Sequence, residues 1–258
     1  MNEKRPLLLS IAGFDPSGGA GVLLDTAVLR SMGFRAAAIL TAVTVQNTAG
    51  LRSIHPLAAR LIKDQWRAVA EDDSIAGIKV GMVGTAENLG MIIRELGRYP
   101  GIPRVIDPVL RATSGAPLID PSAVPGFLDR LRGQATLLTP NREEAARLAR
   151  RPARSIREMD EAARLIFDRS GVACLVKGGR LAGAAVDVLY DGRRSHLFSC
   201  FRIAGDVHGT GCHLSSSIVG FLVRGHDLPQ AVRLAAAATH RAIRKAKPAP
   251  GGRRRFDL

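Results

Sequence analysis

The chain has 258 residues, of which 46% are hydrophobic and 4% aromatic, and it carries a formal net charge of +14. This length suffices for a large core in one domain spanning residues 1–258, and no apolar run reaches the ~18 residues that a membrane-crossing helix needs. Because the cationic side chains are spread along the chain and few aromatic rings can stack on bases, we expect anionic small-molecule substrates and neither a nucleic-acid nor a membrane partner.

A glycine-rich turn follows the first predicted strand. The strand covers residues 7–12, the sequence AGFDPSGGAG covers residues 12–21, and a helical pattern continues from residue 23 to residue 32. α/β proteins bind ligands at such turns, beyond the carboxyl ends of strands. Neither the Gly-Lys-Ser/Thr of a phosphate loop nor the glycine spacing of a dinucleotide site is present. The turn alone is therefore a weak indication of a ligand site.

Strand and helix patterns alternate along the rest of the chain. Short apolar segments predict strands at residues 36–45, 77–80, 104–106, 136–138 and 173–176. Apolar periodicity predicts helices at residues 57–70, 87–97, 124–131, 142–149, 158–170, 214–223 and 228–246. Two further strands, 186–190 and 195–198, read as a hairpin. This alternation predicts an α/β fold with a mainly parallel central sheet, helices on both faces and a small antiparallel addition.

Two polar residues follow the strand predicted at 136–138. Asn141 and Glu144 are three positions apart, so they fall on one face of a helix's first turn. Oxygen ligands there suit Mg²⁺, which meets proteins through few groups and keeps several waters. The alternative is an ordinary capped helix start with a solvated Glu144.

Lys177 ends the strand predicted at 173–176 and precedes two glycines. A cation at this edge of the sheet is placed to meet nucleotide phosphates. The alternative is a solvated lysine at a surface turn, which is where most lysines are found.

The segment HGTGC at residues 208–212 leads into an apolar helix and combines an anion cradle with a reactive side chain. Gly209 and Gly211 allow a tight turn, and the free N–H groups at the helix start favour an anion. Cys212 falls in the first helical turn, where the dipole is expected to lower the thiol pKa and favour a thiolate base or nucleophile. A glycine-rich helix start holding a small buried cysteine is the alternative.

The three cysteines form no metal-ligand spacing, and an odd number leaves one outside any disulfide scheme. The first six residues include an acidic side chain and no long apolar segment follows them, which disfavours a secretory signal. We therefore expect a cytoplasmic protein.

Taken in order, these motifs resemble those of hydroxymethylpyrimidine/phosphomethylpyrimidine kinases, which belong to the ribokinase superfamily. The resemblance runs from about residue 7 to about residue 245. It rests on AGFDPSGGAG at 12–21, TVQNT at 44–48, DPV at 107–109, SG at 114–115, TPN at 139–141 with Glu144, KGG at 177–179, and HGTGC. It implies a ribokinase-like fold.

The resemblance also implies a role for individual residues. In the pyrimidine pocket it places Gly13, Asp25, Gln46, Met82 and Val109, with Cys212 as the general base. The transferred phosphoryl group is assigned to the backbone of Gly209, Thr210 and Gly211, together with Lys177. It assigns ATP binding to Lys177, Asn141 and Thr210, and Mg²⁺ binding to Asn141, Glu144 and Asp107.

The implied activity is ATP- and Mg²⁺-dependent phosphorylation of 4-amino-5-hydroxymethyl-2-methylpyrimidine and then of its monophosphate, by a homodimer. A pyridoxal or pyridoxine kinase is the alternative within the class, and a catalytically silent pyrimidine- or nucleotide-binding regulator is the alternative outside it. The chain departs from the pattern at Arg142 and Glu143, at Arg180, at His213, where relatives carry threonine, and in its tail at residues 250–253.

Overall fold

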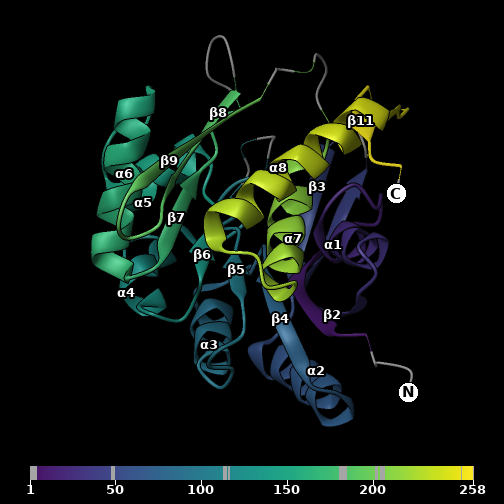
Figure 1. The fold of residues 1–258 in the computed structure, drawn as a ribbon. Coiled ribbons are helices and arrows are strands. Elements are labelled where there is room, and N and C mark those ends of the chain that lie inside the picture. The colour runs from purple at the N-terminus through teal and green to yellow at the C-terminus, as the bar shows by residue number, and fades with distance from the viewer. Residues whose placement is uncertain are drawn as a thin grey trace.

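A sheet of parallel strands with antiparallel edges forms the centre of the computed structural model, which describes residues 5–47, 50–112, 115, 117–179, 185–200, 203, 207–250 and 252–257 (Figure 1). Within these residues the strand order is β3-β2-β1-β4-β5-β6-β7-β8-β9. The strands are β1 (Leu7–Phe14), β2 (Arg35–Asn47), β3 (Gly50–Pro56), β4 (Ile75–Val80), β5 (Arg104–Ile106), β6 (Leu137–Leu138), β7 (Ala173–Val176), β8 (Ala185–Tyr190) and β9 (Ser195–Cys200).

The six strands that are adjacent in the sheet order β2-β1-β4-β5-β6-β7 run parallel to one another, which confirms the mainly parallel sheet. The predicted hairpin of β8 and β9 is confirmed as the antiparallel edge next to β7. Strand β3, antiparallel to β2 at the other edge, was not predicted. Its two large apolar residues, Leu51 and Ile54, are three positions apart, so the alternation typical of a half-buried strand is missing.

Helices cover both faces of the sheet (Figure 1). Helices α1 (Gly21–Ser31), α7 (Thr210–Val223) and α8 (Leu228–Lys245) pack on one face. The other face carries α2 (Ala59–Asp72), α3 (Ala86–Leu96), α4 (Phe127–Leu131), α5 (Arg142–Ala149) and α6 (Ile156–Ser170). A 3₁₀ turn, η1, spans Pro121–Ala123. None of the described helices combines the length and apolarity needed to span a membrane.

Strand β1 shows why the parallel strands read as continuous apolar runs. Its alternate side chains enter two separate cores, with Leu8 on the α1/α7/α8 side and Leu9 and Ile11 on the opposite side. Because both faces are covered, neither set of positions can be polar without a partner. Burial on both faces fixes the sheet and so fixes the positions of the loops at its carboxyl edge.

The C-terminal tail forms a small sheet of its own. Strands β10 (Lys247–Pro248) and β11 (Arg254–Arg255) pair in antiparallel fashion just after α8. Two-residue strands leave no periodic signal, and the sequence analysis did not predict them. The tail reaches back to the start of α7, because Val207 forms a bridge with Arg254.

Candidate functional site

Five of the six parallel strands are followed, just beyond their carboxyl ends, by a residue of the predicted site or of the first glycine-rich turn. In sheet order these are Asp15 after β1, Met82 after β4, Asp107 after β5, Asn141 after β6 and Lys177 after β7. Ligands of open α/β sheets bind at this edge. The sequence motifs therefore converge because the strands that precede them are neighbours.

The two glycine-rich segments from opposite ends of the chain touch each other. Gly209 has φ +83°, and a Cβ on it would lie 2.0 Å from the Gly19 carbonyl oxygen. Gly21 has φ +61°, and a Cβ there would lie 2.2 Å from the Gly13 carbonyl oxygen. Both positions need glycine for conformation and for space. The contact between Gly209 and Gly19 brings the start of α1 beside the start of α7.

Cys212 lies in the first turn of α7, and its sulfur accepts a hydrogen bond from the Gly21 backbone N–H at the start of α1. Two helix N-termini therefore meet at one sulfur, where the sequence indicated only one. The expectation of a lowered pKa is nevertheless wrong. Burial raises the pKa of the Cys212 thiol to about 11, and the charge of Lys79 and the Gly21 hydrogen bond offset this only in part. Cys212 is thus a neutral thiol in the free protein.

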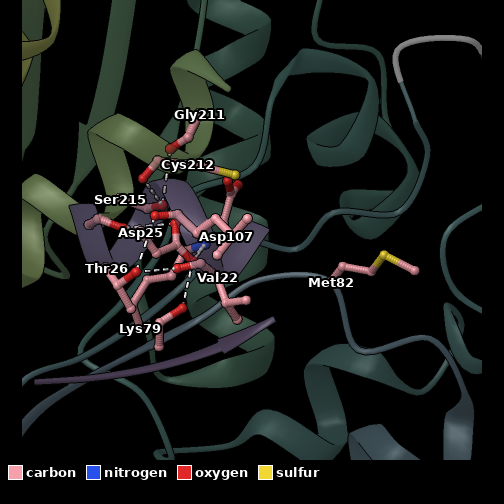
Figure 2. A network of polar contacts seen from close by, with 12 residues as sticks. Val22, Asp25, Thr26, Lys79, Met82, Asp107, Gly211, Cys212 and Ser215 are labelled. Carbon is pink, nitrogen blue, oxygen red and sulfur yellow. Dashed lines mark hydrogen bonds and ion pairs between the residues drawn. The ribbon is translucent and has the colours of Figure 1, made fainter. Parts of the chain in front are cut away.

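A buried ion pair lies close to Cys212. The Lys79 ammonium is 2.7 Å from Asp25 Oδ2, and both side chains are fully inaccessible to solvent. Ser10 Oγ donates to the same carboxylate oxygen at 2.7 Å, and Ser216 Oγ donates to Oδ1 at 2.9 Å. Figure 2 shows Asp25, Lys79, Cys212 and Asp107 gathered together, with Met82 set apart from them. Burial opposes the charge of Lys79, but Asp25 and its other anionic neighbours raise the pKa, so the ammonium stays charged.

Lys177 points at the backbone of the anion cradle. Its ammonium is 2.7 Å from Asp107 Oδ1, and a Cβ on Gly211 would lie 3.0 Å from Lys177 Nζ and 3.2 Å from Asp107 Oδ2. Burial tends to lower the pKa of Lys177, but the charges of Asp107 and Glu144 outweigh it and raise the pKa. The alternative of a solvated surface lysine is therefore wrong. Lys177 is a fixed cation beside the cradle.

Asn141 and Glu144 form a capping box at the start of α5. Asn141 Oδ1 accepts from the Glu144 N–H at 3.0 Å, and Glu144 Oε2 accepts from the Asn141 N–H at 2.8 Å. Glu144 Oε1 also accepts from the Leu110 N–H at 3.3 Å. The capped start is real, but Glu144 is buried, not solvated. Burial raises the pKa of Glu144 to about 7, with Asp107 adding to the effect against the opposing charge of Lys177.

These residues fit a magnesium ion held largely through water. No cluster of three or more histidine, cysteine, aspartate or glutamate side chains suited to a metal occurs among the described residues. Asp107 and Glu144 offer two carboxylates whose charges interact, and a cation beside them would favour the ionised form of Glu144, whose pKa is raised by burial and by Asp107. Mg²⁺ needs only one or two carboxylates besides its waters and the nucleotide phosphates.

An apolar wall brings together three of the residues expected in the pyrimidine pocket. A Cβ on Gly13 would lie 3.0 Å from Met82 Sδ, so a larger residue there would press on the methionine. Met82 is buried with Ala42 and Leu118, and Val109 packs against this group. Among the other motif residues, Ser114 and Arg180 lie outside the described part of the chain.

Gln46 contacts two residues whose contribution the sequence analysis missed. Its side-chain nitrogen is 3.1 Å from His208 Nε2, which is 3.0 Å from Asp15 Oδ2. The three residues come from the end of β2, the start of the cradle and the first glycine-rich turn. No local pattern could reveal a contact between residues 162 positions apart.

His213, one of the departures, contacts the segment that follows the tail departure at residues 250–253. His213 is buried, its Nδ1 is 2.9 Å from Thr239 Oγ1, and its ring centroid is 4.8 Å from that of Phe256. Burial lowers the pKa of His213 to about 4, so the ring is neutral. The tail in turn accepts a hydrogen bond from the His208 N–H at the Arg254 carbonyl. Phe256 and Arg254, which follow the departing residues of the tail, thus contact His213 and the start of the cradle.

Comparisons with known proteins agree with this geometry. The family model described as phosphomethylpyrimidine kinase matches residues 15–255. The hydroxymethylpyrimidine/phosphomethylpyrimidine kinase of Rhizobium meliloti (strain 1021) is 38% identical over 240 residues, covering 92% of this chain and 90% of that protein. The thiamine biosynthesis bifunctional protein ThiED of Geobacter sulfurreducens is 39% identical over 95% of this chain, which spans about 50% of that longer protein.

Two solved structures show the same fold. The crystal structure of phosphomethylpyrimidine kinase from Clostridium difficile 630 has a TM-score of 0.81 at 32% identity, covering 93% of this chain and 100% of that one. The pyridoxal kinase of Staphylococcus aureus in complex with AMP-PCP and pyridoxal has a TM-score of 0.89 at 26% identity, covering 98% and 93%. The curated relatives are closer in sequence than this pyridoxal kinase.

Proposed function

The chain belongs to the phosphomethylpyrimidine kinase family, and we propose that it phosphorylates 4-amino-5-hydroxymethyl-2-methylpyrimidine and then the resulting monophosphate, with ATP as the donor. The observation that carries the proposal is the convergence of Cys212, the glycine cradle and the Lys177–Asp107 pair at one edge of the sheet. This arrangement combines a proton acceptor with groups that neutralise phosphoryl charge. A silent regulator would have no use for both.

In the first transfer, the substrate hydroxyl attacks the γ-phosphorus of ATP, the bond to the β-phosphate oxygen breaks, and ADP leaves. The thiolate form of Cys212 takes the hydroxyl proton. Backbone N–H groups of Gly209, Thr210 and Gly211 face the transferring phosphoryl oxygens, and Lys177 offsets their charge. The two helix starts at the sulfur and the Lys79 charge favour the thiolate, against the desolvation that disfavours it.

ATP use is supported by solved relatives that were obtained with ADP and with AMP-PCP. For this chain we place the nucleotide phosphates beside Lys177, Asn141 and Thr210. Asn141, Glu144 and Asp107 are the residues that would hold Mg²⁺, which would supply positive charge to offset that of the nucleotide phosphates. The single domain, the homodimer, the cytoplasmic location and the absence of a nucleic-acid partner remain predictions.

The second transfer uses a different acceptor at the same cradle. The monophosphate is already largely deprotonated near neutral pH, so its oxygen can attack without a base. Cys212 therefore matters for the first step more than for the second. The cradle and Lys177 serve both steps, because both pass a phosphoryl group.

Ring choice separates this proposal from a vitamin B6 kinase, and Gln46 is the residue that we expect to decide it. Replacing Gln46 by leucine removes a polar partner of the ring, so we expect kcat/KM for the pyrimidine to fall by a factor equivalent to ~1–3 kcal/mol and that for pyridoxine to fall less. Competition between the two substrates for limiting ATP measures both rates in one vessel. A wild type that prefers pyridoxal or pyridoxine, or a variant that loses both rings equally, contradicts the assignment.

A further inference from the structure

Three polar side chains form a chain of contacts that ends at Gln46. The Asp15 carboxylate lies 3.0 Å from His208 Nε2, and the same ring nitrogen lies 3.1 Å from the Gln46 side-chain nitrogen. Asp15 is buried, while His208 and Gln46 are partly buried. His208 Nε2 therefore faces two partners at once. The charge of Asp15 decides whether this nitrogen is a hydrogen-bond donor or an acceptor toward Gln46.

Asp15 requires a proton on His208 Nε2. Burial tends to raise the pKa of Asp15, but the hydrogen bonds with His208 and Ser17 outweigh it and hold the pKa below its usual value. An ionised carboxylate can only accept hydrogen bonds, so Nε2 must be the donor. A ring nitrogen that carries a proton cannot accept one from the amide of Gln46.

The amide of Gln46 must consequently turn its oxygen toward His208. The oxygen and nitrogen of a side-chain amide have nearly the same size, and a half-turn exchanges them without moving other atoms. The oxygen then lies beside the single Nε2–H as its second acceptor, sharing this hydrogen with Asp15, and the NH₂ group points away from His208. Gln46 makes no other side-chain hydrogen bond within the described part of the chain, so both amide hydrogens are left for a ligand.

The first two members of this chain of contacts cannot easily rotate. Asp15 Oδ1 accepts from the Ser17 N–H at 2.9 Å and from Ser17 Oγ at 2.8 Å, which fixes the carboxylate. The His208 ring lies directly over Gly19, where a Cβ would come within 2.5 Å of His208 Cδ2. The donor arrangement is thus built into the first glycine-rich turn.

We propose that Asp15 and His208 are positioning residues that fix Gln46 as a hydrogen-bond donor, so that the site selects rings presenting an unprotonated nitrogen. The inference rests on the proposed function and on the place of Gln46 in the pyrimidine pocket. It also narrows the role of Gln46. An exocyclic amine is itself a donor when it meets an amide NH₂, so Gln46 reads a ring nitrogen rather than the amine. The nitrogen that separates the two rings is the one beside the amine, because a pyridoxine ring has a hydroxyl-bearing carbon at that place.

Substrate analogues test this directly. Two analogues of the hydroxymethylpyrimidine, each with one ring nitrogen replaced by C–H, are compared with the parent at saturating Mg-ATP. For the wild type, we expect one analogue to show a KM about tenfold higher than the parent with kcat changed little, because one hydrogen bond is lost. For His208→Phe, which keeps a flat ring but has no donor, parent and analogue should have similar KM values.

Two further variants separate positioning from general damage. Gln carries a donor nitrogen at about the place of Nε2, so His208→Gln should restore the preference for the ring nitrogen. Asp15→Asn keeps the shape but no longer requires a proton on Nε2, so it should weaken the preference as His208→Phe does. Asp191→Asn is the matched control, because it changes the carboxylate of a separate histidine–aspartate pair, with His196 Nε2 2.7 Å from Asp191 Oδ2 at the turn between β8 and β9, and it should behave as the wild type does. KM for ATP should stay unchanged in all of them.

The outcomes distinguish a failure of the positioning role from a failure of the proposed function. Turnover of the parent by the wild type, with a nitrogen preference that survives in both His208→Phe and Asp15→Asn, overturns the positioning role while leaving the proposed function intact. A wild type that turns over parent and both analogues equally does the same. No turnover of the parent by the wild type overturns the proposed function, and the positioning role with it.

Discussion

Replacing Cys212 by alanine should lower kcat for the first phosphorylation by ~100-fold or more and affect the second phosphorylation less, because general-base assistance is typically worth 10²–10⁴ and only the alcohol needs it. Cys212→Ser should recover little, since a serine hydroxyl ionises less readily than a thiol. The measurement is single-turnover formation of monophosphate from the alcohol and of diphosphate from the monophosphate. Cys174→Ala is the matched control, because Cys174 lies in strand β7 and is buried in the hydrophobic core. Equal losses in both steps would falsify the base role.

The raised pKa of Cys212 adds a pH dependence with a definite sign. The base is active only when deprotonated, and burial raises the thiol pKa to about 11. The active fraction therefore grows as pH increases through the neutral range, and the first-step rate should rise with it. In Cys212→Ala this contribution should disappear. A wild-type rate that falls as pH rises from 7 to 9 contradicts the assignment.

Breaking the buried Asp25–Lys79 pair should have the largest effect on stability. Asp25→Asn leaves the Lys79 ammonium without its counter-charge in a site closed to solvent, and a broken buried pair costs about 3–5 kcal/mol. Lys79→Met should cost a similar amount, and the double variant less than the sum of the two. Urea unfolding monitored by circular dichroism gives the free energies of unfolding.

A surface pair provides the comparison for this prediction. Arg157 and Glu161 are 2.9 Å apart but both are largely exposed, so Glu161→Gln should cost less than about 1 kcal/mol. If Asp25→Asn were equally mild and instead raised only KM for the pyrimidine, Asp25 would act as a substrate ligand and not as the partner of Lys79. The resemblance assigns Asp25 to the pocket, whereas the contacts occupy both of its carboxylate oxygens.

The sequence could predict the parallel sheet because burial on both faces makes each strand a continuous apolar run. It could also predict that the glycine-rich segments bear function, because glycine at a helix start is a local signal. Strand β3 was not predicted because its residues lack the alternation of apolar and polar side chains. Its pairing depends on the free edge that β2 offers in the folded sheet. Strand β11 was not predicted for another reason, because two residues are too few to show a pattern.

The candidate site could be predicted as a set of residues but not as a set of charges. The Cys212 pKa depends on desolvation by distant segments, which outweighs the helix start that the sequence reveals. The sequence shows Lys79 only as a lysine in a predicted strand. The fold places β4 between β1 and β5, where the buried Lys79 ammonium pairs with Asp25. The contact of His208 with Asp15 joins the two ends of the chain, so it exists only in the folded protein.

The most direct test of the central claim is the mass of the products formed from the hydroxymethylpyrimidine with Mg-ATP. We expect the purified protein to add one phosphoryl group and then a second, so that the monophosphate accumulates first and the diphosphate follows. Pyridoxine offered in its place should yield much less product. A protein that phosphorylates pyridoxine efficiently and leaves the pyrimidine unchanged, or that stops at the monophosphate, would contradict the account.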